Sequence, residues 1–414
     1  MQYLEAKKIR NLNIYNLLAL VLGVVVGMVC NGAEHSILGV DQVRTVGDIV
    51  VKLLSWLAVP LVFFSVIHIV SQICNAKRYG KIVLKVFAYF IVTSFIACLI
   101  GIFVALLFKH LELFGEFSLI SSDYLDITPQ LHFMMGVSNI TIADLVDAIL
   151  KENFVSIAIF SLLVGVALAR TGSDGETVGK FVESMNLVIE KLTGILVQIA
   201  PIGVFAMTVK LVFDYGTVKV AQLFWFAVAL FIANLLHILI VFLPAVKFWA
   251  KKSILQFFKH IFPVFAFAVS STSSLACIPL SERVCDALGA RESVTGLVIP
   301  AGYISNMDGT VLYLALSTIF LATSVGVSFS LWQLLLMTLV IILTEFGAAG
   351  VPHAGLIMLS MVLKFMGLDI NLIMILFALD IFFDMGRTSI NVAADLVAVT
   401  CAEEWCKKNE DLSK

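Results

Sequence analysis

The sequence predicts an all-α polytopic membrane protein, and three observations favour this class. Of its 414 residues, 60% are hydrophobic, and the mean hydropathy is +1.03. Only 14% are charged, whereas soluble proteins carry about 25%. Apolar runs of the roughly 20 residues that a helix needs to cross a bilayer recur along the chain. No nucleic-acid partner is expected, and the formal net charge of -2 adds nothing because most charged side chains must lie outside the bilayer.

About eight transmembrane helices are expected. Basic residues precede the first apolar run, and no small-residue cleavage site follows it. An uncleaved first span is therefore favoured over a signal peptide. The candidate spans are residues 13–31, 46–73, 82–108, 154–170, 183–214, 219–248, 292–325 and 370–402.

Two further apolar segments, 255–290 and 331–366, are interrupted midway by VSSTSSLACIP and EFGAAGVPHAG. Backbone cannot be left unpaired in lipid, so each segment must be buried in protein or line a watery cavity. Each is followed by a long span with polar residues, which predicts inverted repeats that each carry a re-entrant helical hairpin. The alternative is two Ser- and Gly-rich helices that pack closely.

Loop charges predict the orientation in the membrane. Cytoplasmic loops are rich in Lys and Arg, and an inside N-terminus satisfies this rule here. The loops near 31–45, 109–140 and 214–218 are poorer in these residues. The first hairpin is then expected on the cytoplasmic side and the second on the outer side. The basic residues expected in the cytoplasm are Lys7, Lys8, Arg10, Lys77, Arg78, Lys81, Arg170, Lys180, Lys247, Lys251 and Lys252.

The last span carries a polar stripe. At about 100° per residue, the polar residues of DIFFDMGRTSINVAAD fall on one helix face within an arc of roughly 100°. A charge at the bilayer centre costs about 2.5–3.5 kcal/mol, so four cost on the order of 10 kcal/mol, and such charges mark ion or substrate paths. The alternative is a salt-bridge network in which Arg387 pairs with Asp384 or Asp380 and only fastens helices. The stripe consists of Asp380, Asp384, Arg387, Thr388, Asn391 and Asp395.

The preceding span contains the run NMDGT, which includes Asn306, Asp308 and Thr310. Asn, Asp and Gly are poor helix formers, so this run is expected to weaken the helix. Weakened turns free backbone carbonyls, which are good ligands for hard cations. The third span adds the hydroxyls of Thr93 and Ser94, which in isolation are expected to bond their own helix backbone.

The charges in these spans do not balance. Asp308, Asp380, Asp384 and Asp395 oppose Arg387 alone, which leaves a surplus of three negative charges if all ionise. Such a site must take up cations or hold protons. The planar guanidinium of Arg387 can bind a carboxylate, and Asp384 can bind an ammonium group. Thr388 and Asn391, on the same face, can bind a second carboxylate. Together they predict an acidic amino acid as substrate.

The chain resembles the dicarboxylate/amino acid:cation symporter family, which includes excitatory amino acid transporters and archaeal aspartate transporters. Its motifs cover most of the chain. VPLVFFS at 59–65 and APIGVFAM at 200–207 resemble the scaffold signatures. SSTSSLACIP, NMDGT, GAAGVPHAGLIML and DMGRTSINVAAD resemble the first hairpin, seventh span, second hairpin and eighth span.

The resemblance implies a role for each matching position. Arg387 would bind the substrate's side-chain carboxylate and Asp384 its amino group. Thr310 would orient Arg387. Thr388 and Asn391 would bind the α-carboxylate, with Ser274 helping from the first hairpin. Val351 and Gly355 would line the outer hairpin. One sodium ion would be bound by Asp395, Asn306 and the carbonyls of Gly302 and Asn391, a second by Thr93, Ser94, Asn306 and Asp308, and a third by carbonyls near Ile304, Met307, Glu345, Phe346 and Ala348.

The resemblance also implies a homotrimer whose transport domain slides across a fixed scaffold, with the outer hairpin as gate. Residues 1–81 and 140–215 would form the scaffold, and 82–110 and 219–402 the transport domain. Residues 403–414 would form a cytoplasmic tail. A plasma membrane, the bacterial inner membrane, is the expected location.

Four positions depart from the family pattern. Leu275 replaces a serine of the first hairpin. Leu314 stands where relatives carry Gln or a proton-carrying Glu, which puts potassium counter-transport in doubt. Glu345 and His353 replace small or neutral residues of the second hairpin. This pair is expected either to carry a proton or, by the simpler interpretation, to be a local ion pair that faces water.

The predicted function is a symporter that takes up L-aspartate and L-glutamate coupled to Na⁺, and not an enzyme. A proton-coupled carrier and a C4-dicarboxylate or cystine carrier are the alternatives within the family, and a neutral amino acid carrier is less favoured because it would leave Arg387 without its anion. An intramembrane aspartyl hydrolase is disfavoured because Arg387 would keep Asp308 and Asp384 ionised. A dedicated ion channel is also disfavoured.

Overall fold

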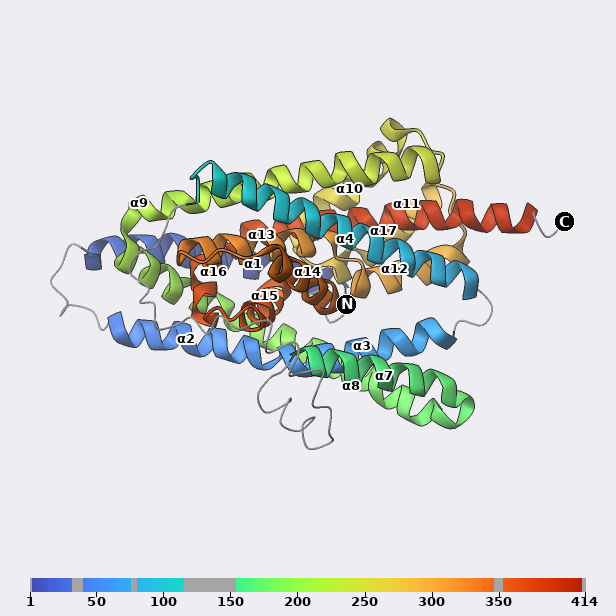
Figure 1. Cartoon of the computed structure of the whole chain (residues 1–414), viewed down its shortest axis with the longest axis horizontal. Helices are drawn as coiled ribbons and strands as arrows, with labels where there is room; N and C mark the ends of the chain where they lie inside the picture. Colours follow the sequence, from blue (N-terminus) through green and yellow to red (C-terminus); the bar gives the residue numbers. More distant parts are fainter. Residues whose placement is uncertain (1, 32–39, 76–79, 115–153, 346–352, 412–414) are drawn as a thin grey trace.

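The computed structural model describes residues 2–31, 40–75, 80–114, 154–345 and 353–411, and every element in these ranges is helical. The helices are α1 (Gln2–Asn31), α2 (Val40–Trp56), α3 (Ala58–Asn75), α4 (Gly80–His110), α7 (Phe154–Thr171), α8 (Glu176–Leu196), α9 (Ala200–His237), α10 (Ile254–Ser271), α11 (Ser274–Ala287), α12 (Glu292–Ser305), α13 (Asp308–Ser324), α14 (Leu331–Glu345), α15 (Ala354–Phe365), α16 (Ile373–Phe377) and α17 (Asp380–Asp411). In Figure 1, α2, α3, α7 and α8 lie along one long edge of the molecule, and α10 and much of α9 lie along the opposite edge. The segments that carry the polar residues lie between these edges.

Six stretches of the described residues are long and apolar enough to cross a membrane, so the protein is a multi-pass membrane protein. The longest, Ser156–Phe213, contains the two predicted spans 154–170 and 183–214. The expected total of eight spans stays a prediction, because the predicted spans 46–73 and 370–402 are not among these six. The six stretches are Asn11–Cys30, Ile82–His110, Ser156–Phe213, Leu223–Trp249, Ile254–Ser271 and Glu292–Ser324.

Two span boundaries differ from the prediction. The candidate span 46–73 is two helices, α2 and α3, that separate at Leu57. Pro60 lacks the amide hydrogen that would continue the ladder from Trp56, so the first helix ends there. Conversely, helical backbone continues through 214–218, where a loop was expected, and α9 bends at the left end of the molecule in Figure 1. α17 itself continues through most of the expected tail, to Asp411.

Both interrupted segments break where the sequence predicts. α10 ends at Ser271, Thr272 adopts left-handed backbone with φ 49°, and the Ser273 side chain accepts a hydrogen bond from the Ala276 amide at the start of α11. In the second segment α14 ends at Glu345, residues 346–352 lie outside the described range, and α15 follows His353, whose φ is 63°. In each segment the two arms pack against each other.

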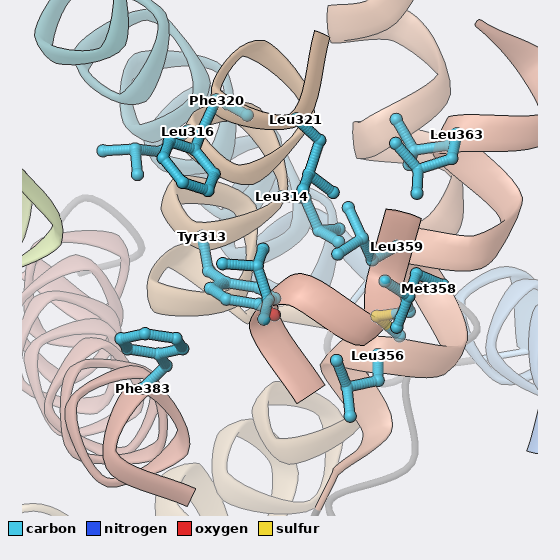
Figure 2. Close-up of a cluster of buried hydrophobic side chains, with 14 of the residues drawn as sticks. Tyr313, Leu314, Leu316, Phe320, Leu321, Leu356, Met358, Leu359, Leu363 and Phe383 are labelled. Carbon is cyan, nitrogen blue, oxygen red and sulfur yellow. The ribbon is translucent and has the colours of Figure 1, made fainter. Parts of the chain in front are cut away.

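The seventh span also breaks as predicted. α12 ends at Ser305 and α13 begins at Asp308, with Asn306 and Met307 in non-helical backbone between them. All of α13 is buried, and it packs against α4, α15 and α17. Figure 2 shows its side chains, among them Tyr313 and Phe320, in one hydrophobic cluster with residues of α15 and with Phe383 of α17. α13 is thus the central helix around which the polar residues are arranged.

Glycines let α1 approach α9 closely. Gly23 and Gly27 are four residues apart and so share one face of α1. A Cβ atom on Gly23 would lie 2.7 Å from Thr208 Cβ, and one on Gly27 would lie 2.7 Å from Val212 Cβ. This small-residue spacing is typical of membrane helices that pack backbone to backbone.

Candidate functional site

The polar stripe of α17 is buried along its whole length. Asp380 and Arg387 are 0% and 1% exposed, and Asp384, Thr388, Asn391 and Asp395 are all 5% exposed or less. The six residues, which are predicted to share one helix face, are thus all buried within the protein. Because the charges do not reach lipid or water, each must find its partners inside the protein.

Arg387 is bound by both aspartates that precede it. Its Nη1 donates to Asp380 Oδ1 at 3.0 Å, and its Nε donates to Asp384 Oδ1 at 3.0 Å. The guanidinium carbon lies 4.4 Å from the centre of the Tyr313 ring, a cation–π distance. The salt-bridge alternative thus describes the Arg387 contacts correctly. It leaves one negative charge uncompensated in this group, however, if both aspartates are ionised.

The second interrupted segment lies against Arg387. A Cβ atom on Gly355 would overlap the guanidinium group, so only glycine admits this approach. The backbone amide of His353 donates to Asp384 Oδ2 at 3.0 Å. The predicted contacts of Val351, Phe346 and Ala348 lie outside the described residues.

Asn391 is engaged by α13. Its Oδ1 accepts from the amides of Gly309 at 2.8 Å and Thr310 at 3.2 Å, and its Nδ2 donates to Thr310 Oγ1 at 3.0 Å. Thr310 therefore positions Asn391, whereas the resemblance implied that it orients Arg387. Thr388 Oγ1 lies 3.4 Å from Asp384 Oδ1. These contacts hold the start of α13 against the stripe.

The helix that carries Ser274 contacts α17, but no described contact joins the Ser274 side chain to the polar stripe. Ser274 is buried as the first residue of α11, and α11 packs against α17. Within the described part of the chain, its side chain makes no hydrogen bond to the stripe. Its expected role in substrate binding stays a prediction.

The first predicted cation site is assembled around Asp395. Asn306 Nδ2 donates to Asp395 Oδ1 at 2.9 Å, and a Cβ atom on Gly302 would overlap the same carboxylate. The Asn306 Oδ1 atom is buried and has no hydrogen-bond partner among the described residues. A carboxylate beside an unpaired amide oxygen is the ligand chemistry that Na⁺ and other hard cations prefer.

The second predicted cation site has partners that were not anticipated. Thr93 Oγ1 donates to Phe90 of its own helix at 3.0 Å, as expected for an isolated hydroxyl. The Ser94 hydroxyl contacts Asp308 at 3.2 Å and Glu345 at 2.8 Å, although its one hydrogen cannot serve both at once. Asp308 Oδ2 also lies 2.9 Å from His237 Nε2.

His237 is the functional candidate that sequence reasoning missed. It is 0% exposed and ends α9, where the helix changes to a π-helix over Ile238–Phe242, a type of irregularity that is frequent at functional sites. The available signal was a histidine inside the apolar run LLHILIVFL.

Glu345 and His353 belong to different networks. The Glu345 carboxylate accepts from the Met307 amide, beside the carbonyls near Ile304 that were predicted to bind a third cation. His353 contacts Asp380 instead. Both residues are 1% exposed, so the interpretation of a water-facing local pair is wrong. The reason is that Ser94 and Met307 lie against Glu345, whereas Asn16, Asp380 and Phe377 lie against His353.

The chain is similar in sequence to known transport proteins. The model of the sodium:dicarboxylate symporter family matches residues 12–405. The C4-dicarboxylate transport protein of Bacillus subtilis (strain 168) is 28% identical over 397 residues, which cover 95% of this chain and 93% of the relative. The protein of the same name from Anaeromyxobacter sp. (strain K) is 29% identical over 96% of this chain and 90% of its own. The proton/glutamate-aspartate symporter of B. subtilis is 30% identical over 88% and 89%.

Proposed function

Because the chain belongs to the sodium:dicarboxylate symporter family, we propose that it takes up L-aspartate and L-glutamate together with Na⁺. It is a cation-coupled transporter and not an enzyme. The observation that carries the choice of substrate is the position of Asp384. This buried carboxylate lies beside the guanidinium of Arg387, with the Nη2 to Oδ1 distance at 2.8 Å.

An acidic amino acid matches the charges of this group. Its side-chain carboxylate replaces both aspartates on Arg387, and its ammonium group then neutralises the Asp384 carboxylate that is released. A plain dicarboxylate has no ammonium group and would leave Asp384 unpaired in a buried site, which is costly. C4-dicarboxylate uptake is nevertheless the second candidate, because relatives along most of the chain carry that name. A cystine carrier is the third.

The proposed Na⁺ binds at Asp395. The unpaired Asn306 Oδ1 and the close approach of Gly302 support this position. The Asp308 site supports a second Na⁺ less well, because His237 and Ser94 already contact that carboxylate. The expected third site has part of its ligands, Phe346 and Ala348, outside the described residues.

Alternating access is proposed to follow an elevator mechanism. Residues 1–81 and 140–215 would stay fixed in the bacterial inner membrane as a trimeric scaffold, and 82–110 and 219–402 would move with the substrate. The grouping is supported by packing, since α3 contacts α7 and α8, whereas α4 contacts α13. The two interrupted segments would be re-entrant, with the second as outer gate.

The test is uptake of radiolabelled L-aspartate into proteoliposomes that contain the purified chain, with Na⁺ and pH gradients imposed separately. We expect accumulation with inward Na⁺ and a large loss when choline replaces Na⁺ at fixed pH. Unchanged uptake in choline contradicts the Na⁺ assignment. Competition by succinate as strong as that by aspartate contradicts the amino acid assignment.

Arg387→Cys tests the carboxylate contact. Losing one partner of a buried charge pair costs about 2–5 kcal/mol, so the affinity for aspartate should fall at least 30-fold. Uptake of a neutral amino acid should rise relative to aspartate. Arg283→Cys, at an exposed position of α11, is the matched control and should keep wild-type affinity. Unchanged aspartate affinity in the Arg387 variant would refute the assignment.

A further inference from the structure

The ring of His353 has partners on two different helices. Its Nδ1 lies 2.7 Å from Asp380 Oδ2 on α17, and its Nε2 lies 3.1 Å from Asn16 Nδ2 on α1. The ring is 1% exposed and stacks at 6.2 Å on Phe377 of α16. The proposed substrate and Na⁺ sites use neither the ring nor its charge, so this ordered environment needs an explanation.

The charges around His353 are unbalanced when the ring is neutral. Among the described side chains, the charged groups that face it are Asp380, Asp384 and Arg387, all from α17. α1 presents the uncharged Asn16, and α16 presents Phe377. Two carboxylates and one guanidinium leave one negative charge in a buried group. One proton on the ring removes it, and histidine is the side chain that ordinarily gains a proton between pH 5 and 8.

Asn16 can serve either charge state of the ring. A neutral ring with hydrogen on Nδ1 accepts at Nε2 from the Asn16 amide group, as the 3.1 Å contact allows. A protonated ring needs an acceptor at Nε2. The Asn16 Oδ1 atom is buried and makes no hydrogen bond within the described residues, so rotation of the amide supplies that acceptor. The same side chain can therefore partner the ring in both charge states.

We propose that His353 is the binding site of a coupling proton and that its protonation releases Arg387 for the substrate carboxylate. The protonated ring makes a charge-assisted hydrogen bond to Asp380, which then needs Arg387 less. Proton and substrate therefore favour each other's binding. When the proton leaves on the far side, Asp380 returns to Arg387 and displaces the substrate.

This inference rests on the proposed function, since it assigns a second coupled ion to the same site. The two are separated by one experiment on the full-length chain in proteoliposomes. The apparent affinity for radiolabelled L-aspartate is measured from pH 5.5 to 8 at constant Na⁺. Wild-type affinity should weaken as pH rises, by up to about tenfold per pH unit, because one proton is linked to binding.

His353→Gln keeps a hydrogen-bonding side chain but cannot take up the proton. The apparent affinity of this variant for L-aspartate should change less than twofold between pH 5.5 and 8. His260→Gln is the matched control, because His260 is an exposed histidine of α10 whose Nδ1 contacts the Gln256 carbonyl of its own helix. This control should follow the wild-type curve. If His353→Gln also follows that curve, the proton site is wrong.

A second variant keeps the test decisive if His353→Gln fails to fold, as judged by size-exclusion chromatography. Asn16→Ala removes the exchangeable partner and should move the midpoint of the pH dependence by at least half a pH unit. An unmoved midpoint overturns the proposal. A wild-type protein that accumulates aspartate with a flat pH curve overturns the proton site alone. Failure to accumulate aspartate or glutamate under any gradient overturns the proposed function.

Discussion

Arg387 owes its position to contacts on every side of its guanidinium plane. Asp380 and Asp384 hold its nitrogens, and the Tyr313 ring covers one face. Gly355 lies against the group and leaves no space for a methyl group. A flat, forked cation fits these constraints, and the compact ammonium of lysine would not. The orientation of this side chain is thus determined by residues from three helices.

Gly355→Ala tests this constraint. The added methyl group meets the end of a flexible side chain, so Arg387 should shift and the fold should survive. We expect the KM for aspartate uptake to rise at least tenfold, because a small displacement of a binding group is expensive. Gly296→Ala, where a Cβ atom would meet nothing within 4 Å, is the control and should keep the wild-type KM. Equal KM values for both variants would contradict the constraint.

At the scale of elements, both interrupted segments contain a left-handed non-glycine residue beside a helix end. Thr272, with φ 49°, is the C-cap of α10, and His353, with φ 63°, is the N-cap of α15. Such backbone costs about 1–3 kcal/mol and persists where surrounding contacts hold it. At Thr272 these contacts include the hydrogen bond that caps α11 through Ser273.

Ser273→Ala should therefore weaken the first segment. Loss of an N-cap costs about 1 kcal/mol, within a range of roughly 0.5–2 kcal/mol. The free energy of unfolding of the purified protein in detergent is the measurement. Ser253→Ala is the matched control, because Ser253 also precedes a helix but its side chain makes no capping bond. A loss of stability as large in the control would show that the cap is not the cause.

The breaks in the helices could be predicted from sequence because their causes are local. The stripe of α17 follows from helical periodicity, and the break at Asn306 follows from poor helix formers. The partners of these residues could not be predicted in the same way. His237 reaches Asp308 from 71 residues away, and Asn16 reaches His353 from 337 residues away. No local pattern encodes such distances.

The boundary errors have a related cause. The expected loop at 214–218 contains Gly216 but no proline, so nothing in it prevents helical hydrogen bonding. The polar and glycine residues at 214–218 are therefore not sufficient to interrupt α9. The exposure of Glu345 and His353 was judged from their place in a loop, whereas neighbouring helices bury both. Burial is a property of the whole fold.

At the scale of the whole molecule, α1 joins the two interrupted segments. Asn13 Nδ2 donates to the Ser270 carbonyl at 3.1 Å and lies 3.4 Å from Thr272 Oγ1, at the turn of the first segment. Asn16, one turn later, contacts His353 at the start of α15. If α1 belongs to the fixed scaffold, these contacts cross the surface along which the transport domain slides.

A cross-link across this surface should stop transport. Asn13→Cys and Thr272→Cys, in a variant without the seven native cysteines, place two thiols where side chains already meet. Aspartate uptake should fall at least tenfold after treatment with a short thiol cross-linker and recover on reduction of a cleavable one. Lys109→Cys with Ser328→Cys, a pair 2.6 Å apart within the proposed transport domain, is the control. Full uptake with the first pair cross-linked would contradict the elevator proposal.

The close packing of α1 against α9 fixes the positions of Asn13 and Asn16 on α1. Gly23 and Gly27 bring α1 against Thr208 and Val212, so α1 cannot bend aside independently of α9. The side-chain amides of Asn13 and Asn16 are therefore held at a fixed separation of about one helical turn. In the proposed elevator mechanism, the contact of Asn13 with the first interrupted segment and that of Asn16 with the second would therefore form and break together.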